Sequence, residues 1–268
     1  MSTTSSRPQA GVKKHFRSSI LLWMRTDQPR QKGMDHWKGP HSGIISASPG
    51  LEEYRQIHLA AVNPGLWPAS EGIQTHIPDD RRADGVAEVT FQSILAPLKG
   101  RAQTKLAYQD EINVFRRTLL YAGLPGTSRW YDVASPADPV GARAAVYLRR
   151  MEGVSGRDFR KVVDNGLVPT LVGTGVLKEL RTQTFLPWTE KTWDTPHVAH
   201  DNPPDQRFHG SVLLGFANTS ARAAFFQDPV IQHLSQTLAP VVSAIHAYDV
   251  SAALTFVKDG KILPHYEQ

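Results

Sequence analysis

An internal repeat constrains the fold of this 268-residue chain more than any other feature of the sequence. The apolar run ILLWMR at 20–25 recurs as AVYLRR at 145–150, 125 positions later. At the same spacing, DGVAEVTF at 84–91 matches HGSVLLGF at 209–216, and PGL at 49–51 matches TGV at 174–176. These matches keep one order along the chain. The sequence therefore predicts two diverged copies of one unit, fused head to tail.

Each copy has the pattern strand, helix, strand, strand, helix, strand. In the first copy we expect these elements at 18–25, 31–47, 51–61, 85–93, 101–117 and within 118–133. In the second copy we expect them at 144–150, 155–172, 176–184, 210–218, 220–243 and 245–257. This order is that of the split βαβ, ferredoxin-like arrangement, whose antiparallel sheet carries both helices on one face.

The second face of such a sheet needs a cover. Alternating residues in 85–93 give both faces apolar character, so the bare faces of two copies can stack and enclose an interior. We predict an α+β fold in which tandem ferredoxin-like repeats form an intrachain pseudo-dimeric α/β barrel. The first repeat is expected at 17–134 and the second at 142–268, after a flexible basic arm at 1–16. A monomer is then possible, and a homodimer stays open.

Composition restricts the partners and the chemistry. The formal net charge is +5, but several positive residues fall in the arm, so nucleic acid is not an expected partner of the folded part. The chain has no cysteine, which excludes disulfides, thiolate metal sites and a cysteine nucleophile. No apolar run approaches the roughly 20 residues that cross a bilayer, so we expect no membrane association and a soluble, cytoplasmic protein.

Two stretches carry a family resemblance. HWKGPHSGIISASPGLEEYRQIHL at 36–59 resembles the helix-to-strand signature of EthD-like proteins in the dimeric α/β-barrel superfamily, and DGVAE at 84–88 is similar to that family's next strand. The second half agrees only in pattern. The resemblance implies a superfamily of polyketide cyclases, lactone isomerases, dehydratase-like proteins, cofactorless oxygenases and some haem enzymes. Such a fold does not fix a function.

His41 is the principal catalytic candidate. Trp37, His41, Ile44 and Ile45 share one face of the predicted helix, so His41 is expected near the interior. An imidazole with an ordinary pKa of about 6.5 can act as acid or base near neutral pH. The alternative is a core histidine that bonds a backbone carbonyl or packs beside Trp37.

The following strand supplies further candidates. Tyr54, Gln56 and His58 share one strand face, opposite Glu53, Arg55 and Ile57, but both sets are mixed and alternation alone does not assign either face to a cavity. His58 is the second catalytic candidate, and Tyr54 could donate to a substrate oxygen; packing is the alternative for each. The candidate substrate-binding residues are Trp37, Trp23 and Phe91.

The repeat allows the two halves to be compared. At the 125-residue spacing, His41 falls on Gly166, Trp37 on Val162 and His58 on Gln183. This asymmetry favours one working pocket in the first half, although divergent packing after duplication explains it almost as well.

A histidine-rich loop resembles a metal site in composition only. PHVAHDNPPDQRFHG at 196–210 lacks a recognised ligand spacing. His76 and Asp80 of the first copy are four apart, as His197 and Asp201 are, which suits a shared turn. We predict no metal site. The sequence also lacks a glycine-rich phosphate loop, a GxSxG elbow and an HExxH motif.

The resulting functional prediction is a cofactor-independent acid/base enzyme of lyase, isomerase, cyclase or dehydratase type. Its expected substrate is a hydrophobic oxygenated small molecule, such as a polyketide, aromatic or lactone compound, and no cofactor is expected. The first alternative is a small-molecule-binding or auxiliary protein without chemistry. The second is a haem-dependent enzyme with His41 or another histidine as axial ligand.

Overall fold

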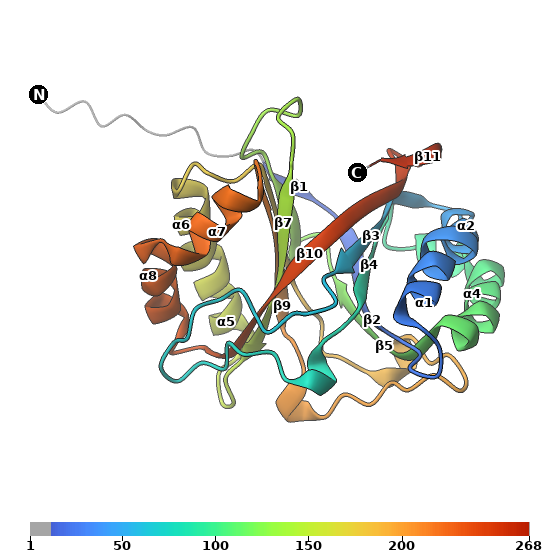
Figure 1. The fold of residues 1–268 in the computed structure, drawn as a ribbon, viewed down its shortest axis with the longest axis horizontal. Helices are drawn as coiled ribbons and strands as arrows, with labels where there is room; N and C mark the ends of the chain where they lie inside the picture. The colour runs from blue at the N-terminus through green and yellow to red at the C-terminus, as the bar shows by residue number, and fades with distance from the viewer. Residues whose placement is uncertain (1–11, 268) are drawn as a thin grey trace, which may run out of the picture.

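A computed structural model describes residues 12–267 (Figure 1). Of the predicted arm, residues 1–11 lie outside the described residues. Residues 12–14 form strand β1 (Val12–Lys14), which pairs with β6 (Ser128–Tyr131).

The first half contains four long strands and two helical segments. The strands are β2 (Phe16–Met24), β3 (Leu51–Leu59), β4 (Gly85–Phe91) and β5 (Phe115–Gly123). The first helical segment runs without a break through α1 (Arg30–His36), the π-helical turn η1 (Trp37–His41) and α2 (Ser42–Ser46), and the second comprises α3 (Ala96–Lys99) and α4 (Arg101–Val114). The strand order is β3-β4-β2-β5, with every pair antiparallel.

The second half repeats this order of elements. Its strands are β7 (Ala142–Arg150), β8 (Glu179–Thr184), β9 (Gly210–Phe216) and β10 (Val242–Lys258), in the order β8-β9-β7-β10. Its helices are α5 (Gly156–Val162), the π-helical turn η3 (Val163–Leu167), α6 (Val168–Gly173), α7 (Thr219–Gln227) and α8 (Pro229–Leu238). The first strand of each half pairs with the third and the fourth, as in a ferredoxin-like unit. A common origin of the halves stays a prediction.

The two halves share one open antiparallel sheet. β10 pairs with β7 and then with β3, so the ladder continues through β1-β6-β8-β9-β7-β10-β3-β4-β2-β5, with β11 (Lys261–Glu267) added to β10. The predicted closed barrel is therefore wrong. The edge of β5 is occupied by a loop instead, because Thr118 N donates to Ala199 O at 3.0 Å and Leu186 N donates to Ala122 O at 2.8 Å.

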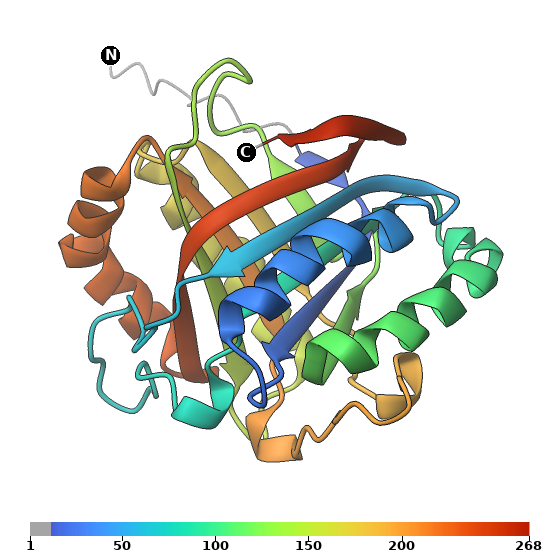
Figure 2. The same cartoon turned by 45° about the vertical axis from the view of Figure 1, so that its right-hand side comes forward.

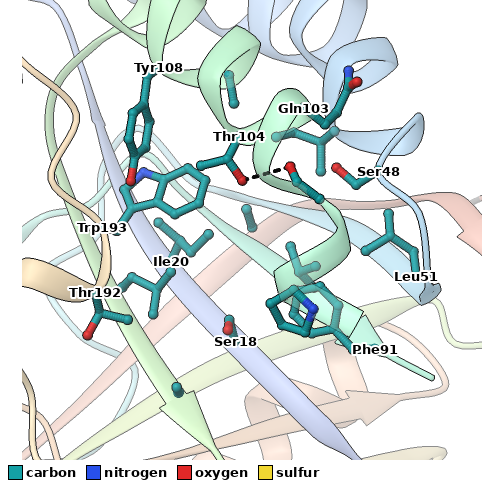
Figure 3. Close-up of a pocket in the computed structure, with 18 of the residues that line it drawn as sticks. Ser18, Ile20, Ser48, Leu51, Phe91, Gln103, Thr104, Tyr108, Thr192 and Trp193 are labelled. Atoms are coloured by element: carbon teal, nitrogen blue, oxygen red, sulfur yellow. Dashed lines mark hydrogen bonds between the residues drawn. The ribbon is translucent and has the colours of Figure 1, made fainter. Parts of the chain in front are cut away.

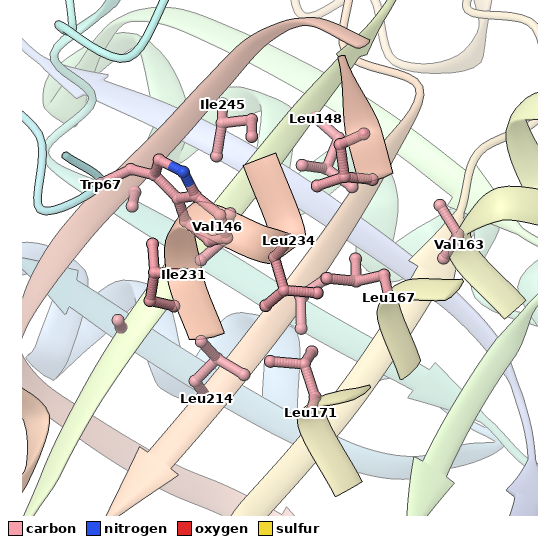
Figure 4. Packing of buried hydrophobic residues seen from close by; sticks show 14 of the residues in the cluster. Trp67, Val146, Leu148, Val163, Leu167, Leu171, Leu214, Ile231, Leu234 and Ile245 are labelled. Carbon is pink, nitrogen blue, oxygen red and sulfur yellow. The ribbon is translucent and has the colours of Figure 1, made fainter. Parts of the chain in front are cut away.

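Helices cover the outer face of each half, as Figures 1 and 2 show. One hydrophobic core lies under the helices of the first half, and a second lies under those of the second half, where Leu167, Ile231 and Leu234 pack on strand residues (Figure 4). A third core joins the inner faces, with Leu21 and Trp23 from one half packed in one cluster with Tyr147 and Tyr248 from the other. No helix of the described residues is long and apolar enough to cross a membrane.

The inner faces also carry buried ion pairs between the halves. Arg55 of β3 lies 2.6 Å from Glu179 of β8, and Arg181 of β8 pairs with Glu53 of β3. Within the first half, Arg17 lies 3.0 Å from Glu88. Buried charges of this kind require a matched partner, so they favour one register between the halves.

Candidate functional site

A cavity of about 290 Å³ lies in the first half, between the outer face of the sheet and helices α2 and α4 (Figure 3). Because side chains alternate along a strand, even-numbered residues of β2 and odd-numbered residues of β4 reach this space. The walls are mainly apolar, with Ile20, Leu22, Val89, Phe91 and Leu120 among them. This volume is close to the lower end of the usual range of small-molecule pockets, about 300–1,000 Å³.

His41 lines the cavity from the last position of the π-helical turn η1. Such turns inside α-helices often occur at functional sites. The residue is only 3% exposed, and its Nδ1 lies 2.9 Å from Oδ2 of Asp110. Within residues 12–267, this is the one hydrogen bond of the His41 imidazole, so Nε2 has no partner. With Nδ1–H donated to a carboxylate, Nε2 is free to accept a proton.

Asp110 of α4 fixes this tautomer. Burial raises its pKa, but hydrogen bonds from His41 and His36 outweigh burial and lower the pKa below its ordinary value. Nε2 of His36 lies 2.9 Å from Oδ1 of Asp110. Asp110 is thus an ionised acceptor shared by two histidines.

Glu111, the next residue of α4, also lines the cavity and is 2% exposed. Burial raises its pKa, even though Thr195 and Trp193 donate hydrogen bonds to its carboxylate. A carboxyl group of this kind can stay protonated and act as a proton donor. The two neighbouring acids therefore have opposite character, one ionised behind His41 and one with a raised pKa at the cavity wall.

A loop from the second half completes the cavity. Thr192 and Trp193, from the 185–209 connection between β8 and β9, lie against the wall formed by α4. The Trp193 ring meets Tyr108 edge to face at 4.9 Å. Sequence reasoning missed Asp110 and Glu111, and it favoured a packing role for Trp193. The only available signal was the predicted helix at 101–117, on which Gln103, Thr104, Ala107, Tyr108 and Glu111 recur at three- and four-residue spacing.

The rings of Phe16 and Phe91, which both line the cavity, lie 5.6 Å apart. Both also border an outer groove that includes Lys14 and Glu52. The aromatic pair thus borders both the cavity and the groove.

The predicted site residues do not all reach the cavity. Trp37 and Phe91 line it, as His41 does, but His58 and Tyr54 lie outside the lining. His58 stacks on Trp37 at 4.7 Å, its Nε2 lies 3.0 Å from Oε1 of Gln56, and burial lowers its pKa to about 4. Tyr54 is fully buried, its hydroxyl accepts from Gln56 at 2.9 Å, and burial raises its pKa.

Trp23 points to the other side of the sheet. It belongs to the core between the halves, where the guanidinium of Arg117 lies 4.9 Å from its ring. It is not among the residues that line the cavity.

The histidine-rich loop is tied to the backbone. Nδ1 of His200 lies 2.9 Å from Thr118 O, and its Nε2 lies 3.1 Å from Thr195 O. Across residues 12–267, no group of three or more His, Asp or Glu side chains is arranged to hold a metal ion.

No family model matches the sequence, and no curated protein matches it. Solved structures do match. A proposed monooxygenase from Lactobacillus acidophilus NCFM superposes with a TM-score of 0.52 at 9% identity, covering 96% of this chain and 100% of that one. An anthrone oxidase-like protein superposes with a TM-score of 0.56 at 10% identity, covering 91% of this chain and 96% of that one. This chain shares their fold.

A proposed monooxygenase from Fusobacterium nucleatum subsp. nucleatum gives a TM-score of 0.50 at 6% identity, covering 92% of this chain and 99% of that one. At these identities the likeness shows the fold alone. Membership of the dimeric α/β-barrel superfamily and the EthD-like assignment both stay predictions.

Proposed function

We propose that this chain is an acid/base enzyme that binds a hydrophobic, oxygenated small molecule in the cavity of the first half. The observation that carries the proposal is His41, which is buried in an apolar wall, anchored through Nδ1 to Asp110 at 2.9 Å and unpaired at Nε2. A buried histidine held by a carboxylate is one arrangement that supports general base catalysis.

In the proposed reaction, Nε2 of His41 accepts a proton from an acidic C–H or O–H group of the substrate. Asp110, ionised because His41 and His36 lower its pKa, stabilises the imidazolium that forms. Glu111, whose pKa burial raises, donates a hydrogen bond or a proton to the substrate oxygen on which negative charge develops. The apolar walls restrict water, which strengthens both interactions.

Returning the proton from His41 to another carbon gives isomerisation, and transferring the Glu111 proton to a departing hydroxyl gives dehydration. Both outcomes use the same two groups. Substrates with an aromatic, polyketide or lactone skeleton suit the lining, since it is mainly apolar and includes no Lys or Arg side chain.

Haem, which the resemblance implies for some proteins of the superfamily, fits these residues poorly. His41 with Asp110 would suit an axial ligand and its carboxylate partner. However, no Lys or Arg of the lining could hold the two propionates, and the cavity volume of about 290 Å³ is small for a porphyrin. The proposed reaction therefore contains no haem step.

Solvent deuterium exchange tests the proposal without a known substrate. We would incubate the protein in D₂O with a panel of aromatic ketones, anthrones and lactones and follow loss of C–H signals by NMR. Wild type should accelerate exchange in at least one compound, and His41→Asn should lower that rate by about 10² to 10⁴-fold. The matched control is His233→Asn, because His233 of α8 is exposed; it should leave the rate unchanged.

Two results would favour the alternatives. Saturable binding of the fluorescent probe N-phenyl-1-naphthylamine without exchange of any compound would support a binding protein. A Soret band in the purified protein would support haem. Equal exchange rates in wild type and His41→Asn would remove His41 from the mechanism.

A further inference from the structure

Three arginines gather at one end of the interior between the two halves, away from the cavity. They are Arg81 of the short helix η2 (Asp79–Arg81), Arg117 of β5 and Arg149 of β7. The connections 60–84 and 185–209 cover this end, at the bottom of Figure 1. Arg117 links the two connections, because its guanidinium donates to Asp80 O at 3.4 Å and to Asp201 O.

Aromatic side chains connect the other two arginines. Tyr248 Oη donates to Arg81 O at 2.8 Å, and its ring lies 6.5 Å from His246. The His246 ring lies 5.4 Å from Phe208, over which Arg149 sits at 5.9 Å. Arg81, Arg149 and His246 therefore belong to one cluster.

Arg81 is 3% exposed, yet its guanidinium makes no hydrogen bond within residues 12–267. Its one ion pair is to Asp80 at 3.4 Å, and that carboxylate is 60% exposed. A buried cation held only by a solvent-screened carboxylate is costly. An unsatisfied buried donor in a native protein often marks the position of a water or ion.

The neighbours have unused donors as well. Within the described part of the chain, Nε of Arg149 and Nδ1 of His246 are buried without a hydrogen-bond partner. Nη1 of Arg149 donates to Oε1 of Gln74 at 3.1 Å, and Nε2 of His246 lies 3.4 Å from the same oxygen. The amide oxygen of Gln74 thus accepts from both Arg149 and His246, while no carboxylate among residues 12–267 makes a hydrogen bond to either.

The electrostatics of the cluster point the same way. Burial, then Arg149 and Arg81, lower the pKa of His246 to about 3. Burial and Arg81 also lower the pKa of Arg149 and of Arg117, against the opposing influence of Asp205 and Asp201 respectively. The Asp201 side chain is 69% exposed, so solvent screens the attraction between its carboxylate and the guanidinium of Arg117. Arg81 thus lowers the pKa values of Arg117, Arg149 and His246, while the opposing carboxylates of Asp201 and Asp205 belong to exposed residues. Such an arrangement favours an anion.

We propose that Arg81 and Arg149, together with His246, bind a small oxyanion at this end of the interior. The planar guanidinium fork matches the spacing of carboxylate and phosphate oxygens. Inorganic phosphate and a carboxylate are two sources of this chemistry. The proposed oxyanion site lies apart from the His41 cavity, so the proposal can hold or fail independently of the proposed enzyme activity.

Thermal unfolding of the full chain tests the site. We would titrate sodium phosphate and sodium acetate separately, each against sodium chloride at matched ionic strength. A ligand that binds only the folded state raises the Tm with its concentration. We expect a saturable rise beyond chloride with at least one oxyanion, and the two arms tell a phosphate site from a carboxylate site.

Substitutions show which residues cause the rise in Tm. Arg81→Gln should abolish the oxyanion-specific rise, and in chloride alone its Tm should equal or exceed that of wild type, because an unpaired buried charge is removed. Arg157→Gln, at an exposed position of α5, should keep the wild-type response. If Arg81→Gln does not fold, Arg149→Gln supplies the same comparison at a half-buried position.

Coincident phosphate, acetate and chloride curves for wild type would overturn the proposal. An unchanged oxyanion response in the folded arginine variants would overturn it too. A lower Tm of Arg81→Gln in chloride would show that Arg81 is satisfied by the protein itself, and would also count against the site.

Discussion

Nε1 of Trp193 lies 3.1 Å from both carboxylate oxygens of Glu111. The tryptophan belongs to the loop between β8 and β9, whereas the glutamate belongs to α4 of the first half. A donor from one half thus holds an acid in the cavity wall of the other. The cavity requires both halves of the chain.

Trp193→Phe tests this contact. The variant keeps an aromatic ring against Tyr108 but leaves Glu111 with one donor fewer, so we expect a loss of about 1–3 kcal/mol in the free energy of unfolding. Urea denaturation measures it. Trp188→Phe, in the same loop, provides a comparison, since Glu111 bonds Trp193 and Thr195 instead. Equal losses in both variants would show that the Glu111 bond contributes nothing specific.

Ala107→Phe should fill the cavity. Ala107 is fully buried on the α4 face that lines it, so a phenyl ring there competes with a ligand for the same volume. The affinity for N-phenyl-1-naphthylamine, measured by fluorescence titration, should fall at least 10-fold. Ala102→Phe lies on the exposed face of the same helix and should bind the probe as wild type does. Unaltered probe affinity in Ala107→Phe would place the probe elsewhere.

Gly85→Ala should destabilise the first half. A Cβ at Gly85 would lie 2.3 Å from Cζ3 of Trp37, which is fully buried and cannot move aside freely. Overpacking of this kind costs about 1–3 kcal/mol. Thermal or urea unfolding would detect it, with Gly126→Ala as the control, because a Cβ there meets nothing within 4 Å. A stability equal to that of the control would mean that the indole shifts at little cost.

His58 predicts a pH dependence of stability. Burial lowers its pKa in the folded state to about 4, whereas the unfolded chain has the ordinary value of about 6.5. The unfolded state therefore binds more protons between these values, and stability falls as the pH drops from about 6.5 to about 4, by about 3 kcal/mol for this residue. Urea denaturation at pH 7 and pH 4.5 should show a smaller difference for His58→Gln than for wild type. Other buried histidines also contribute to the pH dependence of wild-type stability. If the variant shows the same pH dependence as wild type, His58 does not contribute to it.

Much of the fold followed from local patterns. The strands predicted at 51–61, 85–93 and 210–218 overlap β3, β4 and β9, because apolar alternation and the flanking glycines mark strands locally. The hairpin strand β6 and the terminal strand β11 were missed. Closure of the barrel was predicted wrongly, since the loop that occupies the β5 edge comes from the other half and leaves no local signal.

The site was less accessible to sequence reasoning. The helical face that brings His41 to the cavity could be read from its spacing with Trp37. The faces of β3 could not, because Glu53 and Arg55 look like exposed residues until their partners Arg181 and Glu179 are brought opposite them. The roles of Asp110 and Trp193 could not be predicted for the same reason, because they depend on contacts with distant segments of the chain, to His41 and to Glu111 respectively.

Strand β10 is hydrogen-bonded to β7 over Val242–Val250 and to β3 from Val250 to Val257. A chain cut between β6 and β7 would leave β3 with its outer row of amide and carbonyl groups unpaired. An unprotected edge of this kind is a template for aggregation. Expressed alone, the 12–133 segment should therefore aggregate rather than fold independently, because the strand that covers the β3 edge belongs to the second half of the chain.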